Sequence, residues 1–202
     1  MTTALPMFPL GTVLFPSLVL PLHVFEPRYR ALVDDCESGD GEFGVVLIER
    51  GNEVGGGDVR TDVGTVASLV QVERFADGRS AIAAVGTRRV RVRQWLDDDP
   101  YPRAEVDDWP DPSRPTLPLD ELDTLFRRSL ALATELGEAG APIDVEVDDD
   151  PVLATFQVAA LAPLGAADRQ AVLATETADE RTQRLTELLT DGLELLAARL
   201  GG

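Results

Sequence analysis

The sequence contains one histidine, His23, and one cysteine, Cys36, and these are its candidates for nucleophilic catalysis. A thiol attacks a substrate when a nearby imidazole takes its proton, so the two residues could form a nucleophile–base dyad. However, His23 stands between apolar residues in a strand-like segment, and Cys36 belongs to an apolar helix stripe. Because a buried cysteine usually acts as a small hydrophobic residue, we expect no catalytic dyad.

Lysine is absent, and all 18 of the Lys and Arg residues are arginine. A P-loop needs a lysine at the β- and γ-phosphates, and although residues 51–56 have the glycine spacing, Gly57 and Asp58 stand where Lys-Ser/Thr should be. We interpret 51–58 as a mobile loop. Ser-Lys hydrolases and Schiff-base enzymes are excluded in the same way. With a single histidine as well, the sequence predicts no catalytic residue, no metal site and no cofactor.

Two aspartate runs, at 97–99 and 148–150, are the most concentrated carboxylates. Aspartate favours turns and helix starts, so we interpret both runs as solvated turns and caps. Weak calcium binding is the alternative, although neither run has the spacing of an EF-hand. A small hydrolase that uses acidic residues alone also stays open.

Arg89, Arg91 and Arg93 alternate along one predicted strand and form the only basic stripe of the sequence. Such a stripe could contact RNA. Opposite charges on adjacent strands stabilise a sheet, and Glu105 and Asp107 alternate on the following strand. We therefore favour pairing within the sheet over RNA binding.

The net charge of the chain is −18, from 36 acidic residues against 18 basic ones. A field of this sign repels phosphate backbones and anionic membranes, so nucleic-acid and membrane partners are disfavoured. Prolines interrupt the uncharged stretch 1–25, and each interior proline costs a helix about 3 kcal/mol, so it should not span a membrane. A single cysteine fits a reducing compartment, and we expect a cytoplasmic protein.

The elements that would position these residues change character near Pro112. Before it, alternating and β-branched runs predict about six strands and a single helix at 27–37. Strand signals that cluster, rather than alternate with helices, favour a closed or half-closed barrel. The expected extended segments are 5–10, 13–15, 18–25, 43–48, 64–75, 79–85, 87–95 and 103–106.

After a stiff proline-rich linker at 110–118, the hydrophobic period becomes helical. Capping signals at Asp150–Pro151 and at Thr177–Glu180 predict two of the helix starts. The sequence thus predicts an α+β protein, with a barrel subdomain at 1–112 and a helical bundle at 113–202.

One long motif runs from Phe8 to Arg30: Phe-Pro-Leu-Gly-x-Val-Leu-Phe-Pro-x-x-x-Leu-Pro-Leu-His-Val-Phe-Glu-Pro-Arg-Tyr-Arg. It resembles the opening of the Lon protease N-terminal, substrate-binding domain family. Shorter similar stretches follow, so that the resemblance covers nearly the whole chain; they lie at 43–48, 64–67, 86–92 and 101–106. The resemblance implies a PUA-like pseudo-barrel followed by a helical bundle, with no catalytic residue. We interpret the Glu26–Tyr29 signature as a helix start with an ion pair.

The resemblance also implies a role, because in Lon this region helps to recognise unfolded or tagged polypeptides and to assemble the hexamer. The sequence ends at Gly202 without an ATPase or a Ser-Lys protease segment, so we expect a non-catalytic, stand-alone polypeptide-binding protein. It would act as an adaptor or regulator of proteolysis, with a protease or chaperone as candidate partner. The alternatives are an RNA-binding PUA-like protein and a structural homodimer built on the final leucine-rich helix.

We place the expected polypeptide site at Phe15, Pro16, Leu18 and Val19. The uncharged N-terminal segment has more apolar side chains than one strand face can bury, so some should form an exposed patch for an extended peptide. Burial of all of them is the alternative. A crevice between the two subdomains would favour binding there.

Overall fold

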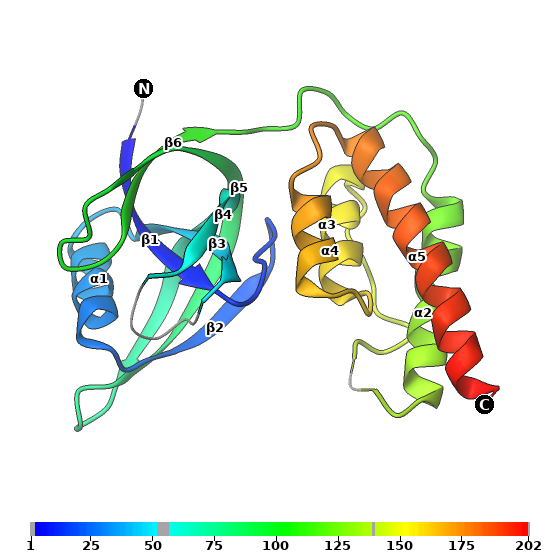
Figure 1. Cartoon of the computed structure of the whole chain (residues 1–202), viewed down its shortest axis with the longest axis horizontal. Helices are drawn as coiled ribbons and strands as arrows, with labels where there is room; N and C mark the ends of the chain where they lie inside the picture. Colours follow the sequence, from blue (N-terminus) through cyan, green and yellow to red (C-terminus); the bar gives the residue numbers. More distant parts are fainter. Residues whose placement is uncertain (1–2, 52–56, 139, 202) are drawn as a thin grey trace. The chain divides into compact units, whose positions relative to one another are not determined.

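The structure, a computed structural model, describes residues 3–51, 57–138 and 140–201. Six strands, with one helix between the second and the third, are followed by four helices (Figure 1). The strands are β1 (Thr3–Leu10), β2 (Val19–Val24), β3 (Glu42–Arg50), β4 (Val59–Arg74), β5 (Ser80–Leu96) and β6 (Arg103–Asp108). The helices are α1 (Pro27–Ser38), α2 (Asp120–Glu135), α3 (Pro151–Leu161), α4 (Ala166–Leu173) and α5 (Ala178–Leu200).

The chain divides into two compact units, Met1–Pro110 and Asp111–Gly202, which we call the barrel unit and the helical unit. The first unit holds all six strands and α1, and the second holds the other four helices. None of the helices in the described residues combines the length and apolarity needed to cross a membrane.

The strands of the barrel unit form one sheet in the order β2-β5-β4-β3-β1-β6. Because β6 also pairs with β5, the sheet closes on itself through β1, β3, β4, β5 and β6, and β2 is added outside this ring. β5 can pair with both β2 and β6 because it is 17 residues long and its register with β4 shifts near Thr87. A bulge bends a strand and increases its twist. The predicted pseudo-barrel is confirmed.

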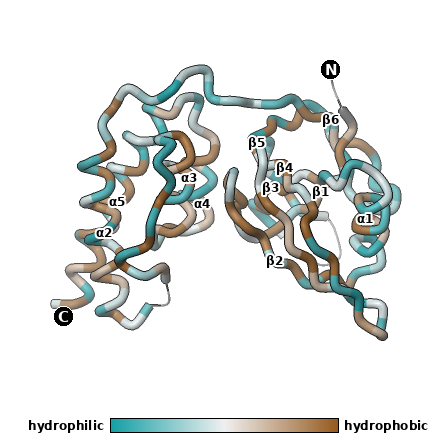
Figure 2. The backbone as a smooth tube through the Cα atoms, turned by 180° about the vertical axis from the view of Figure 1, so that it is seen from behind, coloured by the Kyte–Doolittle hydropathy of each residue, from teal (hydrophilic) through white to brown (hydrophobic). Residues whose placement is uncertain are grey.

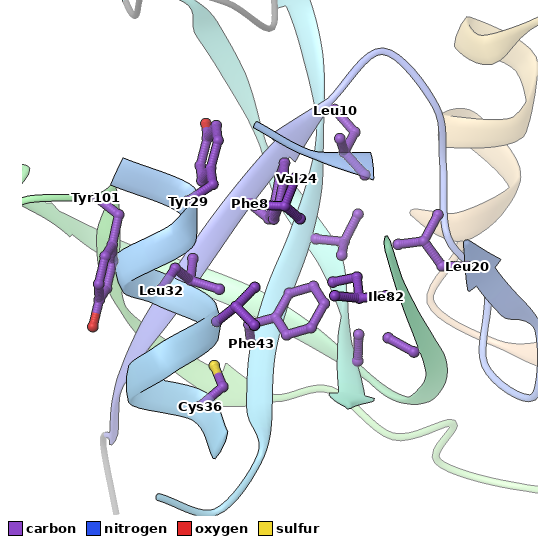
Figure 3. Packing of buried hydrophobic residues seen from close by; sticks show 14 of the residues in the cluster. Phe8, Leu10, Leu20, Val24, Tyr29, Leu32, Cys36, Phe43, Ile82 and Tyr101 are labelled. Atoms are coloured by element: carbon purple, nitrogen blue, oxygen red, sulfur yellow. The ribbon is translucent and has the colours of Figure 1, made fainter. Parts of the chain in front are cut away.

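Helix α1 packs against the core of the barrel unit. Its predicted apolar stripe is buried: Tyr29, Leu32, Val33 and Cys36. Figure 3 shows Tyr29, Leu32 and Cys36 beside Phe8 and Phe43. The rings of Phe8 and Tyr29 stack with centroids 4.0 Å apart and planes inclined by 8°. Such a pair contributes about 0.5–1.5 kcal/mol beyond its buried area, so β1 and α1 are tightly joined.

The helix starts of the helical unit follow the predicted caps. Asp150 accepts hydrogen bonds from the N–H groups of Val152 and Leu153 at the start of α3. Thr177 accepts from the N–H of Glu180 at 3.1 Å, and the N–H of Glu176, just before the cap, donates to the carboxylate of Glu180. The bonds to Asp150 and Thr177 satisfy N–H groups that a helix start leaves without intrahelical partners. α5 then packs against α2, α3 and α4.

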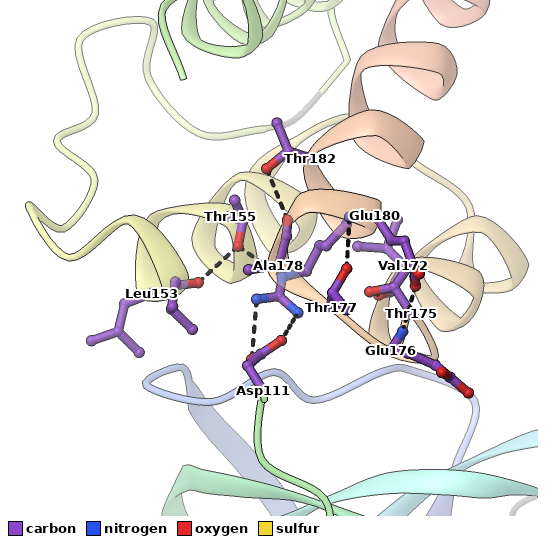
Figure 4. A network of polar contacts seen from close by, with 12 residues as sticks. Asp111, Leu153, Thr155, Val172, Thr175, Glu176, Thr177, Ala178, Glu180 and Thr182 are labelled. Atoms are coloured by element: carbon purple, nitrogen blue, oxygen red, sulfur yellow. Dashed lines mark hydrogen bonds and ion pairs between the residues drawn. The ribbon is translucent and has the colours of Figure 1, made fainter. Parts of the chain in front are cut away.

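The predicted linker is held by the helical unit rather than free. Arg181 of α5 has a side chain that is 0% exposed, and it donates to both carboxylate oxygens of Asp111, at 3.0 and 3.2 Å. The same guanidinium donates to the Thr155 hydroxyl at 2.7 Å and lies 3.8 Å from the ring centroid of Phe156. Figure 4 shows Asp111 reaching this buried cluster. Proline spacing alone did not indicate an anchor seventy residues away.

A second anchor follows along the same segment. The carboxylate of Asp179 accepts hydrogen bonds from the Thr116 N–H and hydroxyl and from the Leu117 N–H, at 2.7–3.0 Å. These bonds lower the pKa of Asp179, because they favour its charged form. The segment 111–117 therefore belongs to the helical unit, which begins two residues before the boundary that the prolines predicted.

Candidate functional site

The predicted patch at 15–19 divides into buried and exposed residues. Phe15 is only 1% exposed and Pro16 is buried, so neither offers a surface to a ligand. Leu18 is half-buried against the barrel core, whereas Val19 is 64% exposed. The expectation of an exposed patch thus fails for Phe15 and Pro16 and holds for Val19.

Long-range backbone contacts explain why this segment is buried. The Thr65 hydroxyl donates to the Leu14 carbonyl at 2.6 Å, and the Ser17 N–H donates to the Gly86 carbonyl at 2.8 Å. A Cβ atom at Gly86 would lie 2.2 Å from the Phe15 carbonyl oxygen, so only glycine permits this approach. The segment is therefore fixed to β4 and β5, and Phe15 turns inward.

The outer edge of β2 has no strand partner in the part of the chain that the structure describes. The Gly86 N–H donates to the Leu18 carbonyl, so the backbone groups of Leu18 point towards β5. Since antiparallel pairs alternate, the backbone groups of Val19, Pro21 and His23 point away from the sheet. Pro21, which has no N–H, occupies an outward position where β5 loses no hydrogen bond. This edge thus presents three carbonyls and the N–H groups of Val19 and His23.

Two hollows meet at the C-terminal end of β2. The larger, of about 350 Å³, is lined by the segment His23–Phe25 and by Phe75, Arg79 and Ser80. The smaller, of about 180 Å³, lies between β1 and β2. Phe25 is 50% exposed and Phe75 is 40% exposed. We call the outer edge of β2 with these two phenylalanines the β2 surface; Figure 2 colours β2 largely as hydrophobic.

Three arginines lie beside the β2 surface, and one of them, Arg30, donates its Nε–H to the Phe25 carbonyl at 3.0 Å. Arg79 bonds to Asp77 at 2.7 Å, and Arg28 bonds to Glu26 at 3.1 Å. The second pair confirms the ion pair predicted at the start of α1. The Arg79–Asp77 pair is exposed, and exposed pairs of this kind contribute little to stability.

The structure separates His23 from Cys36. His23 is exposed on β2, whereas the Cys36 thiol is buried and donates to the Glu42 carbonyl at 3.4 Å. Burial raises the pKa of Cys36 to about 12, so the thiol is protonated at neutral pH. The pair therefore has neither the contact nor the charge state of a nucleophile–base dyad.

The arginine stripe is used inside the barrel unit. Arg89 is buried, and its guanidinium lies 4.6 Å from the ring centroid of Trp109. Arg91 lies 4.2 Å from the same ring, and Arg93 forms an ion pair with Asp107. The three residues do not form a free basic face. Sequence reasoning missed Trp109, whose only signal was its position directly after the last strand.

The aspartate runs also have local roles. The Asp150 N–H donates to the Asp148 carboxylate at 2.8 Å, and Asp150 caps α3, in agreement with the interpretation as turns and caps. No group of three or more His, Cys, Asp or Glu side chains is placed to hold a metal ion within the described ranges. Most of the predicted loop at 51–58, residues 52–56, lies outside these ranges.

Comparison with known proteins identifies the family to which this architecture belongs. A family model described as the ATP-dependent protease La (LON) substrate-binding domain matches residues 4–191. The chain belongs to this family.

Relatives of the chain in the Lon family are much longer. The chain is 29% identical to the Lon protease of Dictyoglomus thermophilum, over 95% of this chain and 25% of that protein. It is 31% identical to Lon protease 2 of Syntrophobacter fumaroxidans, over 91% of this chain and 24% of that protein. The chain thus spans about a quarter of the length of these relatives.

Solved structures share the fold. The crystal structure of the Lon N-terminal domain protein from Xanthomonas campestris is similar with a TM-score of 0.69 and 29% identity, covering 91% of this chain and 96% of that one. The N-terminal domain of the Mycobacterium avium complex Lon protease has the same fold, with a TM-score of 0.61 and 21% identity. In the present chain, the motif that resembles Lon covers the end of β1, the segment before β2, β2 itself and the start of α1. It therefore supplies the edge strand and Phe25 of the β2 surface.

Proposed function

We propose that this chain binds extended segments of unfolded polypeptides at the β2 surface and performs no catalysis itself. One observation carries the proposal: outward backbone groups of β2 lie beside two exposed phenylalanines, Phe25 and Phe75. An extended polypeptide offers backbone groups that can add to a strand edge and alternate side chains that can enter hollows.

Pro21 limits the number of hydrogen bonds that an added strand can form with β2. An added strand finds no N–H at Pro21, and each hydrogen bond that does form contributes about 1 kcal/mol net. Natural proteins place proline on edge strands to prevent permanent edge-to-edge pairing. The β2 surface should therefore bind clients weakly and reversibly, with apolar side chains at Phe25 and Phe75 adding affinity.

The family supports polypeptides as the clients, since its description names a substrate-binding domain. In our proposal the chain acts as an adaptor or regulator of proteolysis in the cytoplasm, and a protease or chaperone is the partner that receives the client. The four helices of the second unit would form a bundle.

A structural homodimer is the second candidate, because Leu195 of α5 is 68% exposed and Leu200 is 40% exposed. The RNA alternative has less support, since Arg89, Arg91 and Arg93 contact Trp109 or Asp107. Sedimentation analysis of wild type and Leu195→Ser separates the dimer from the monomeric client-binding protein.

The test of client binding uses a permanently unfolded, fluorescently labelled model protein and measures its anisotropy. We expect Phe25→Ser combined with Phe75→Ser to weaken binding by about tenfold, which corresponds to about 1.4 kcal/mol. Leu195→Ser removes an exposed apolar side chain from the helical unit and serves as the control. Equal binding by all three proteins would place the site elsewhere.

A second arm tests the backbone pairing. A short apolar peptide is compared with the same peptide N-methylated at alternate residues, which removes the donors along one edge. Binding that is lost for only one of the two methylation patterns supports strand addition at β2. Equal binding of both methylated peptides would contradict it.

A further inference from the structure

A separate hollow of about 190 Å³ lies in the helical unit, between α2, the end of α3 and the start of α4. Apolar side chains, among them Leu130, Ala133, Ala141 and Leu161, form part of its wall, and polar groups form about half of it. Arg169 of α4 is the one arginine that lines it among the described residues. The hollow therefore combines a small, partly apolar space with a cation.

Arg169 is incompletely satisfied. Its Nη2 donates to the Ala162 carbonyl at 3.1 Å, while its Nε is buried without a hydrogen-bond partner in the described part of the chain. No carboxylate of those residues forms an ion pair with it, and burial lowers its pKa because it disfavours the charged form. Nη1 has no partner there either, and it is not among the buried atoms.

The surrounding carboxylates do not neutralise the charge of Arg169. Glu138 also lines the hollow, but its carboxylate bonds to Arg199 at 2.6 Å. The sequence has 36 acidic residues for 18 arginines, so a partner for Arg169 is not missing for lack of acids. The Ala162 carbonyl at the end of α3 offers partial compensation, as helix C-termini do for cations. A partly buried cation with one neutral acceptor remains unfavourable.

We propose that this hollow binds a carboxylate that carries a small apolar group, with Arg169 as its ion-pair partner. A guanidinium presents paired N–H donors in a plane, which matches the two oxygens of a carboxylate. Nη1, the second hydrogen of Nη2 and the buried Nε are the donors that remain. The apolar part of the wall contacts the group attached to the carboxylate. Such a ligand is either the C-terminal residue of a polypeptide or a free short-chain carboxylic acid.

The experiment follows the ¹H–¹⁵N signals of the full chain, including arginine Nε–H, during titration with three probes. The probes are a short peptide that ends in alanine with a free carboxylate, the same peptide with an amidated end, and isobutyrate. Arg169→Gln removes the cation. Arg128→Gln is the matched control, because Arg128 is an exposed arginine of the same unit.

We expect the free-acid peptide to bind and the amidated peptide not to bind. Arg169→Gln should weaken binding at least tenfold, whereas Arg128→Gln should change it less than twofold. If isobutyrate binds as tightly as the peptide and with the same dependence on Arg169, the site binds free carboxylates. If the peptide binds more tightly, the site recognises the C-terminal residue of a polypeptide. Both results support the proposal.

The absence of binding by every probe, or equal binding by wild type and Arg169→Gln, overturns it. Should Arg169→Gln fail to fold, Ala141→Leu decides instead, because it fills the hollow and keeps the arginine. This variant must lose binding if the ligand occupies the hollow. None of these results depends on the β2 surface, so the two proposals fail or succeed separately.

Discussion

Two arginines of the helical unit, the fully buried Arg181 and the partly buried Arg169, have different surroundings. Arg181 bonds to Asp111 and Thr155 and lies against the ring of Phe156. Arg169 donates to a single carbonyl, that of Ala162. Burial lowers the pKa of both, but only for Arg181 does a carboxylate oppose this shift. The hydrogen-bond partners separate a structural arginine from one that is available to a ligand.

The barrel unit contains a parallel contrast between Phe15 and Phe25. Phe15 belongs to a segment fixed by Thr65 and Gly86, and its side chain is core. Phe25 follows the end of β2 and is half exposed. In both units, residues with many long-range partners should control stability, and residues with few should control binding. The following changes test this division.

The largest effect is expected for Asp111→Ala. This change leaves Arg181 buried without its carboxylate, and breaking a buried pair costs about 3–5 kcal/mol. Urea unfolding followed by circular dichroism at 222 nm measures the loss. Arg114→Ala is the control, since Arg114 is 80% exposed in its pair with Asp150 and such pairs contribute about 0–1 kcal/mol. Equal effects of the two variants would show that the buried Arg181–Asp111 pair stabilises the protein no more than the exposed Arg114–Asp150 pair.

Phe15→Ala should come next. Truncation of a buried phenylalanine costs about 3–5 kcal/mol, here reduced if the segment 14–18 relaxes into the space. Phe25→Ala should cost less than about 1 kcal/mol, because surface substitutions have small effects. Both tryptophans, Trp95 and Trp109, lie in the barrel unit, so tryptophan fluorescence reports its unfolding. A destabilised Phe25→Ala variant would mean that the β2 surface is part of the core.

Arg169→Gln should change the free energy of unfolding by less than about 1 kcal/mol in either direction, because it removes an uncompensated charge and one hydrogen bond. Arg181→Gln, the matched substitution, should cost several times more. Thermal unfolding of both variants measures the difference. A loss of more than about 2 kcal/mol for Arg169→Gln would make Arg169 a cap of α3 and equal in kind to Arg181.

The smallest effect concerns the fixed segment itself. Ser17 has φ of 66°, a left-handed conformation that is unfavourable for serine but open to glycine. Ser17→Gly should therefore stabilise the barrel unit by up to about 1 kcal/mol, after the entropy that glycine loses. Gly41→Ala tests the converse, because Gly41 has φ of 77° and no atom near a new Cβ. Destabilisation by Ser17→Gly would show that the segment is less fixed than its contacts indicate.

Sequence reasoning succeeded where short-range patterns carry the information. The apolar stripe of α1 follows from a spacing of three and four residues, and it is buried as predicted. The caps of α3 and α5 follow from Asp150 and Thr177, whose side chains bond to residues two or three positions away. The switch from strands to helices near the prolines follows from the same local periodicity.

The sequence by itself thus determined which elements form, the pseudo-barrel, and the lack of lysine and paired histidines on which several catalytic sites depend. Only the tertiary structure decided which side chains of these elements are used. The Thr65–Leu14 bond joins residues 51 positions apart, and the Arg181–Asp111 pair joins residues 70 positions apart. Neither contact leaves a periodic signal, because its partners belong to different elements. The burial of Phe15 and the unpaired state of Arg169 depend on such contacts, made or missing, and therefore appear only once the chain is folded.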